Sequence, residues 1–192
     1  DISMLVDPVV QSFIYENGLY IRSPESKNVL SPQDLRFRTY RRSVDELPEE
    51  MCTLLDRTAR PLGVTLCARA GAMLGWAAGH TLQTADLYEA LRSIEAAHYV
   101  RRHTSGRILM VDAVRAGVWK ELQPDAAENC RMLLNELLAR SLESDHTYAL
   151  CCCQKEEREI YDALQQLGFL PVPDCEGIFY VDMRMPVMLL QD

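Results

Sequence analysis

The residues best suited to chemistry in this chain are two histidines and one aspartate. His80 and His98 carry side chains that titrate near neutral pH, so each could accept or donate a proton. Asp112 is the only acid within the apolar run 107–114, where it alternates with Val111 and so faces the opposite side of a strand. Because a lone histidine or strand carboxylate is also common as a packed or solvated side chain, both interpretations stay open.

Cysteines form the second candidate group. The chain has seven, an odd number, and three of them are adjacent at 151–153. Adjacent strand residues point to opposite faces, so this is not a disulfide framework, and we predict a reducing, cytoplasmic compartment. Cys151 and Cys153 could share a face with His146 and hold zinc. Since no pair of cysteines has the usual ligand spacing, the sequence favours small core side chains and predicts no metal.

The overall charge limits the classes of partner. A formal net charge of −8 argues against a nucleic-acid binder whose affinity comes from clustered Lys and Arg. One basic run, RFRTYRR at 36–42, reads as a solvated strand face, although nucleotide phosphates are an alternative ligand for it. No apolar run approaches the roughly 20 residues that a membrane span needs, so we predict no membrane partner.

The domain organisation is simple. The 192 residues fit one domain, with residues 1–34 as an N-terminal extension and 35–192 as the folded unit. The chain starts at Asp1 rather than Met, and it ends directly after the apolar run 186–190. We therefore expect a domain excised from a larger protein, although a shortened chain would look the same.

Strands and helices alternate along the chain. The strand patterns lie at 35–42, 64–68, 72–82, 107–114, 146–153, 170–173 and 178–190. Helical spacing of apolar residues predicts helices at 84–102, 126–142 and 155–167. A further helix should open at a capping box formed by Ser43 and Glu46 and end at 60–63.

The end of the chain resembles a known family. A strand at 146–153, a helix that ends in Leu167-Gly168-Phe169 and two closing strands are similar to the second half of the GNAT N-acetyltransferase fold. The element order matches over about 35–190, with an inserted helix at 84–102. The resemblance implies an α/β fold with a mixed, mostly antiparallel central sheet flanked by helices.

A looser likeness concerns the setting of the domain. The stretch 104–109 and the ending 181–187 resemble GNAT-like modules of bacterial, cytidyltransferase-related multidomain proteins. This implies other domains of a parent protein as partners.

The GNAT resemblance implies an acyl-CoA cofactor such as acetyl-CoA, held where the fourth and fifth strands separate. The positions that it assigns to this cofactor are Val111, Ala113, Val114, Arg115, Gly117 and Lys120. The family grips the pyrophosphate with a glycine-rich loop at a helix N-terminus, because free N–H groups there attract phosphate. The corresponding glycines are absent near Ala126, Glu128 and Cys130. Asp125 and Glu128 suit the helix dipole but repel a phosphate.

The resemblance also implies roles in catalysis. The position of the family's tyrosine acid is Leu164 here, and Tyr161 lies one turn earlier, from where it could protonate the departing thiolate. A half-buried structural Tyr161 is the alternative. Asp112 is the implied base on the fourth strand.

Two functions follow from this resemblance. The first is an acyl-CoA-dependent N-acyltransferase that acts on a small-molecule or protein amine. The second is a degenerate GNAT-fold domain that has lost CoA binding and serves as a docking or regulatory module. The structure of segment 115–125 would distinguish these two functions, because only the acyltransferase needs free N–H groups there that face an open cleft.

Overall fold

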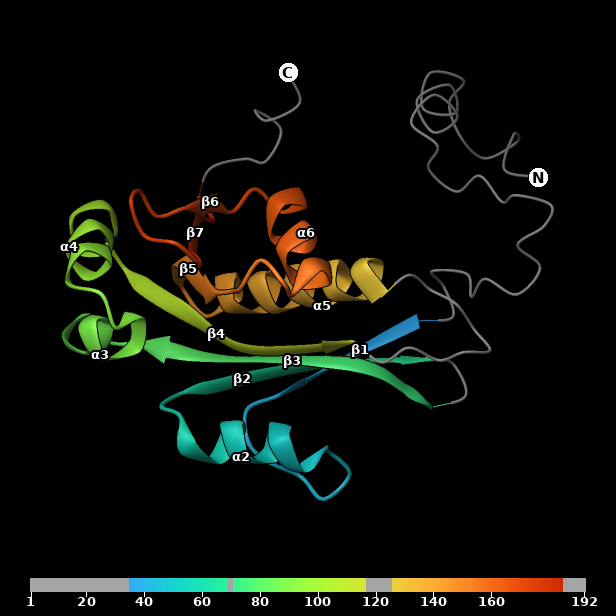
Figure 1. Ribbon diagram of the computed structural model, residues 1–192. Helices are drawn as coiled ribbons and strands as arrows, with labels where there is room; N and C mark the ends of the chain where they lie inside the picture. Colours follow the sequence, from blue (N-terminus) through green and yellow to red (C-terminus); the bar gives the residue numbers. More distant parts are fainter. Residues whose placement is uncertain (1–34, 69–70, 117–125, 185–192) are drawn as a thin grey trace, which may run out of the picture.

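The computed structural model describes residues 35–68, 71–116 and 126–184, which form one sheet covered by helices on both faces (Figure 1). The predicted extension at 1–34 lies outside these residues, as do Gly117, Lys120 and Asp125. The strands are β1 (Leu35–Tyr40), β2 (Pro61–Ala68), β3 (Met73–Leu82), β4 (Arg107–Ala116), β5 (His146–Cys152), β6 (Leu170–Pro171) and β7 (Ile178–Asp182). The helices are α2 (Glu49–Arg57), a 3₁₀ turn η2 (Thr84–Asp86), α3 (Leu87–Leu91), α4 (Ile94–His103), α5 (Ala126–Glu143) and α6 (Arg158–Gln166).

The seven strands lie in the order β1-β2-β3-β4-β5-β7-β6. All neighbouring pairs are antiparallel except β4 and β5, which run parallel. The predicted α/β class, with a mixed, mostly antiparallel sheet between helices, is therefore confirmed.

Several element boundaries differ from the sequence prediction. The capping box at Ser43 and Glu46 is wrong: α2 begins at Glu49, directly after Pro48, which provides no side-chain cap. Proline disfavours the helical region for the residue before it, so the helix cannot extend back through that point. The Ser43 hydroxyl instead donates to Asp56 Oδ1 at 2.7 Å. Strand β2 starts at Pro61, where proline is tolerated as the first strand residue, rather than at 64.

The predicted helix at 84–102 is two helices. Arg92 takes a left-handed conformation, with φ of 52°, which ends α3. Ser93 then caps α4 by accepting a hydrogen bond from the Ala96 N–H at 3.1 Å. The apolar spacing of the segment continues across this break, so periodicity alone does not detect it.

Each face of the sheet is covered by a different set of helices (Figure 1). Helices α5 and α6 pack on one face, around Leu109, Val111 and Leu133. Helix α2 packs on the other face around Trp76, and α3 with α4 pack further along it around Met110. This second face therefore carries two separate apolar clusters.

Strand β1 is the free edge of the sheet. Its residues at 36–39 are all exposed, because β1 pairs only with β2 and neither of its faces is covered. The basic run is thus solvated, as predicted, although its aromatic and arginine residues do not alternate between a buried and an exposed face.

The register of β3 against β4 contains one extra residue. Ala78 pairs with Ala113 and Gly79 pairs with Val111, so Asp112 is the bulged residue. On the other side of β4, pairing with β5 stops at Val111 and Cys151. Strand β5 ends at Cys152 and pairs with β7 along its other edge, whereas β4 continues to Ala116, so β4 has no β5 partner beyond Val111.

Gly79 allows the close approach at this bulge. A Cβ atom at Gly79 would lie 2.6 Å from the Met110 carbonyl oxygen of β4, which backbone pairing holds in place. We expect Gly79→Ala to lower the free energy of unfolding by roughly 1–3 kcal/mol in a urea titration. Gly63→Ala is the matched control, because its Cβ would meet only side-chain ends, Met51 Cε at 2.6 Å and Leu55 Cδ2 at 3.2 Å. Equal losses in the two variants would contradict this account.

His146, the first residue of β5, connects this strand with β3 and α5 through side-chain hydrogen bonds. Its Nδ1 lies 2.9 Å from the Ser141 carbonyl, to which it donates, and its Nε2 lies 2.9 Å from Thr81 Oγ1. Burial lowers the pKa of His146 below its ordinary value of 6.5. The folded chain therefore favours the neutral ring more strongly than the unfolded chain does.

This depressed pKa makes stability depend on pH. Below pH 6.5 the unfolded chain binds a proton at His146 that the folded chain resists, so stability from this residue is full above that pH and is lost as the pH falls. We expect the free energy of unfolding of His146→Gln to decline less between pH 7 and pH 5 than that of the unmodified chain. His98→Gln, at an exposed position, should keep the original slope.

Candidate functional site

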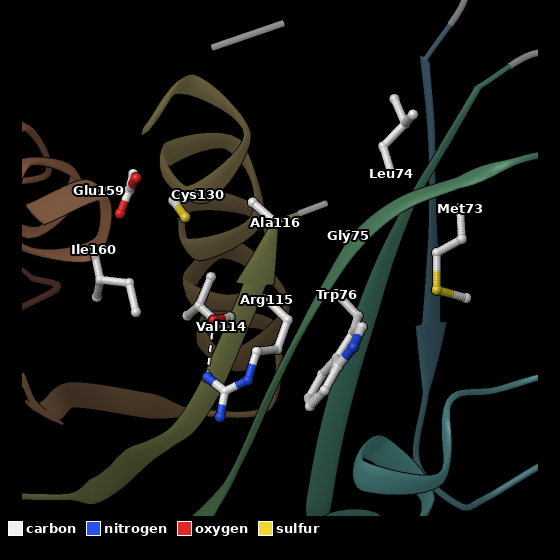
Figure 2. A pocket seen from close by; sticks show the side chains of 10 residues that line it. All are labelled: Met73, Leu74, Gly75, Trp76, Val114, Arg115, Ala116, Cys130, Glu159 and Ile160. Atoms are coloured by element: carbon white, nitrogen blue, oxygen red, sulfur yellow. Dashed lines mark hydrogen bonds between the residues drawn. The ribbon is translucent and has the colours of Figure 1, made fainter. Parts of the chain in front are cut away.

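A pocket of about 430 Å³ lies beside the end of β4 (Figure 2). Its walls come from the start of β3, the end of β4, the second turn of α5 and the first turn of α6. The lining residues are Met73, Leu74, Gly75, Trp76, Val114, Arg115, Ala116, Cys130, Glu159 and Ile160. Of the predicted cofactor residues, Val114 and Arg115 line it, whereas Val111 and Ala113 are buried in the two cores on opposite faces.

Arg115 is tied to a helix that the sequence did not connect with it. Its Nη2 lies 2.7 Å from Glu50 Oε1 of α2, and its Nε lies 3.3 Å from Glu50 Oε2. Its Nη1 also donates to the Val114 carbonyl at 3.1 Å, and the guanidinium lies beside Trp76 (Figure 2). Glu50 therefore balances the positive charge of Arg115, which weakens its attraction for a phosphate.

The acidic side chain that faces this pocket is Glu159 of α6, which the sequence analysis did not single out. Glu128, predicted to repel phosphate, instead forms a bidentate ion pair with Arg131, in which Arg131 Nε lies 2.9 Å from Glu128 Oε2. The negative charge near the pocket thus comes from Glu159 rather than from an unpaired Glu128.

Tyr161 lies next to the pocket rather than in its lining. Its ring packs edge-on against Phe179, with ring centroids 5.6 Å apart, and it is half-buried against the core. Leu164, at the position of the family's tyrosine, is fully buried. The neighbouring residue Ile160 does line the pocket.

Asn129 carries a buried side-chain amide whose two polar atoms have no hydrogen-bond partner among the described residues. Its side chain has no exposed surface, and neither its amide nitrogen nor its amide oxygen has a hydrogen-bond partner within the described residues. It lies on α5 beside Cys130, which lines the pocket. An unpaired buried amide costs stability, and such groups commonly mark a position where a ligand or water binds.

His80 and Asp112 were separate candidates in the sequence, and the structure brings them together. His80 on β3 and the bulged Asp112 on β4 form a pair in which His80 Nδ1 lies 2.7 Å from Asp112 Oδ2. Their side chains are 19% and 15% exposed. His98, in contrast, is exposed on α4. The 32 residues between His80 and Asp112 explain why spacing alone could not link them.

Two of the three adjacent cysteines occupy the core, whereas Cys152 between them is exposed. Cys151 and Cys153 are buried, and burial raises the pKa of both thiols, that of Cys153 to about 11. A metal ligand must be a thiolate, which these sites disfavour. Both ring nitrogens of His146 are already hydrogen-bonded. Within 35–68, 71–116 and 126–184, no group of three His, Cys, Asp or Glu residues could hold a metal ion.

No protein-family model and no curated protein matches the sequence. Solved structures do match the fold. Arabidopsis thaliana NAA60 in complex with acetyl-CoA has a TM-score of 0.51 at 8% identity, covering 79% of this chain and 99% of that chain. An N-acetyltransferase from Staphylococcus aureus has a TM-score of 0.48 at 8% identity over 79% of this chain and 99% of that one.

A mutant of the toxin AtaT, bound to the C-terminus of the antitoxin AtaR and to acetyl-CoA, matches with a TM-score of 0.45. It is 13% identical over 83% of this chain and 99% of its own. The likeness to NAA60, together with the strand order, shows that the chain has a divergent GNAT fold. Among the described residues, no helix is long and apolar enough to cross a membrane.

Removing the unsatisfied amide of Asn129 should stabilise the protein. We expect Asn129→Ala to raise the free energy of unfolding by roughly 1–2 kcal/mol, because it removes a desolvated amide and improves helix propensity. The control is Asn135→Ala, at an exposed position of the same helix, which gains only the propensity. Chemical denaturation of both variants measures the difference. A smaller gain for Asn129→Ala than for Asn135→Ala would contradict an unpaired amide.

Proposed function

We propose that this chain is an acyl-CoA-dependent N-acyltransferase domain, within residues 35–192 of a larger protein. The observation that carries the proposal is the end of β4–β5 pairing at Val111 and Cys151, which leaves the rest of β4 without a β5 partner beside a pocket of about 430 Å³. The β5-facing backbone groups of β4 beyond the bulge are left without a strand partner among the described strands. Such groups can hydrogen-bond an extended amide chain.

The residues around this pocket fit the acyl and pantetheine parts of the cofactor. Its walls are largely apolar, and Val114 and Cys130, the chain neighbour of the unpaired Asn129, both line it. When bound, acyl-CoA supplies a thioester whose acyl group an amine can attack. The phosphate contacts proposed for Gly117 and Lys120 fall outside the described residues. Arg115 would contribute only if Glu50 released it.

Within this proposal, Asp112 takes part in removing the proton from the amine, and Tyr161 is the acid. The Tyr161 hydroxyl, or water, would protonate the thiolate that leaves. We also propose a reducing, cytoplasmic setting, because the three adjacent cysteines at 151–153 do not have the arrangement of a disulfide framework.

A second candidate function is a docking or regulatory module that has lost CoA binding. Two features of the described pocket favour it: Glu50 neutralises Arg115, and Glu159 adds a negative charge. Both work against an anionic ligand.

Calorimetry with acetyl-CoA at low and moderate salt separates these two functions. We expect micromolar affinity, about 8 kcal/mol, for the unmodified chain. Glu159→Gln should tighten binding roughly two- to fivefold, because it removes a negative charge near an anionic ligand. Glu156→Gln, an exposed acid outside the pocket lining, should leave the affinity unchanged. No detectable heat up to millimolar acetyl-CoA would contradict the acyltransferase and leave the docking module.

A further inference from the structure

A second pocket, of about 390 Å³, opens on the sheet face that α2 and α3 cover. It lies between the end of α2, near Arg57, and the start of α3, near Asp86 and Glu89. His80 and Asp112 line it, together with Met110. It occupies the part of this face between the apolar cluster under α2 and the apolar cluster under α3 and α4.

The His80–Asp112 pair gives this pocket a polar group suited to proton transfer. Asp112 Oδ2 accepts the Nδ1–H of His80, which fixes the tautomer and leaves Nε2 as the proton acceptor. Nε2 makes no hydrogen bond to the described residues. A histidine oriented by a carboxylate in this way is a general base, because the carboxylate stabilises the imidazolium that forms.

Strand β4 contributes residues to both this pocket and the first pocket, at the end of β4. Asp112 lines one and Val114 lines the other, and two residues of extended strand separate them by roughly 7 Å. The bulge between them turns the side chain of Asp112 toward the face of α2 and α3. The side chains of Asp112 and Val114 lie on opposite faces of the sheet, so an acyl group would reach the amine past the edge of β4 that β5 leaves unpaired beyond Val111.

We propose that the pocket between α2 and α3 binds the acceptor, an aliphatic amine with a second positive charge, and that His80 takes its proton. This rests on the acyltransferase function proposed above. The carboxylates of Asp86, Glu89 and Asp112 outnumber the single guanidinium of Arg57 in the described lining. Asp86 and Glu89 form no ion pair within the described residues. A distal ammonium group can thus pair with them while the reacting amine lies at His80.

The chemical step balances with these groups. The neutral amine nitrogen forms a bond to the acyl carbonyl carbon, and the carbon–sulfur bond breaks. The amine proton moves to His80 Nε2, and the thiolate takes a proton from the Tyr161 hydroxyl or from water. Asp112 acts through His80 and is a positioning residue, whereas His80 touches the reacting nitrogen.

Three four-carbon amines test the substrate class: 1,4-diaminobutane, n-butylamine and 4-aminobutanoate, each with acetyl-CoA and the full chain. Mass spectrometry of the N-acetylated product gives kcat/KM for each. We expect the diamine to exceed butylamine by about tenfold and aminobutanoate to be the poorest. Combined Asp86→Asn and Glu89→Gln should remove the preference for the diamine over butylamine. Asp162→Asn, an exposed acid of α6, is the control and should retain the preference.

Variants of the histidine test the base. His80→Gln should lower kcat by about 10²–10⁴ while acetyl-CoA affinity in calorimetry stays unchanged. Added imidazole should restore part of the activity of His80→Ala, which a merely structural role would not allow. Asp112→Asn should lower kcat with little change in KM for acetyl-CoA.

The outcomes separate this inference from the proposed function. Three outcomes would overturn the inference and leave the proposed cofactor site standing. They are full activity of His80→Gln, equal rates for the three amines, and binding of acetyl-CoA without acetylation of any of the amines. Absence of acetyl-CoA binding would overturn the acyltransferase and, with it, the transfer step. Calorimetry with 1,4-diaminobutane alone would then show whether the pocket binds diamines, and no heat would overturn that part too.

Discussion

One extra residue in β4 marks where the surroundings of this strand change. Asp112 has no partner in the register with β3, and the pairing of β4 with β5 ends at the preceding residue, Val111. A bulge bends a strand and increases its twist, and beyond this bulge β4 continues to Ala116 without a β5 partner. The pocket beside β4 and the exposure of the Asp112 side chain on the other face both depend on this irregularity. Gly79 permits it, because its missing Cβ leaves space for the carbonyl of Met110.

The inserted helices α3 and α4 give the domain its most individual feature. They pack on β4, β5 and the residues around β7 through an apolar cluster that includes Leu87, Met110 and Leu150. Since α2 covers the same face nearer to Trp76, the space between the helices is a pocket with polar walls. The insertion therefore shapes the surroundings of His80 and Asp112 rather than only extending the fold.

The cofactor side shows a different balance of forces. A phosphate ligand would meet Glu159 and an arginine already neutralised by Glu50, so electrostatic attraction from the described residues is weak. Binding there would depend on backbone groups of β4 and on apolar contact. The buried amide of Asn129 fits this picture, because it carries a desolvation cost in the free protein that a polar ligand could relieve.

Local sequence patterns determined most of the elements and the character of the core. Apolar periodicity placed the strands and the long helices, and the burial of Cys151 and Cys153 follows from their places on an apolar strand. Periodicity did not detect the break at Arg92 or the effect of Pro48 on the start of α2, because both depend on single-residue backbone conformations. Only the tertiary structure brought His80 to Asp112 and Glu50 to Arg115. Those contacts span 32 and 65 residues and arise from strand register and helix packing, which no local pattern encodes.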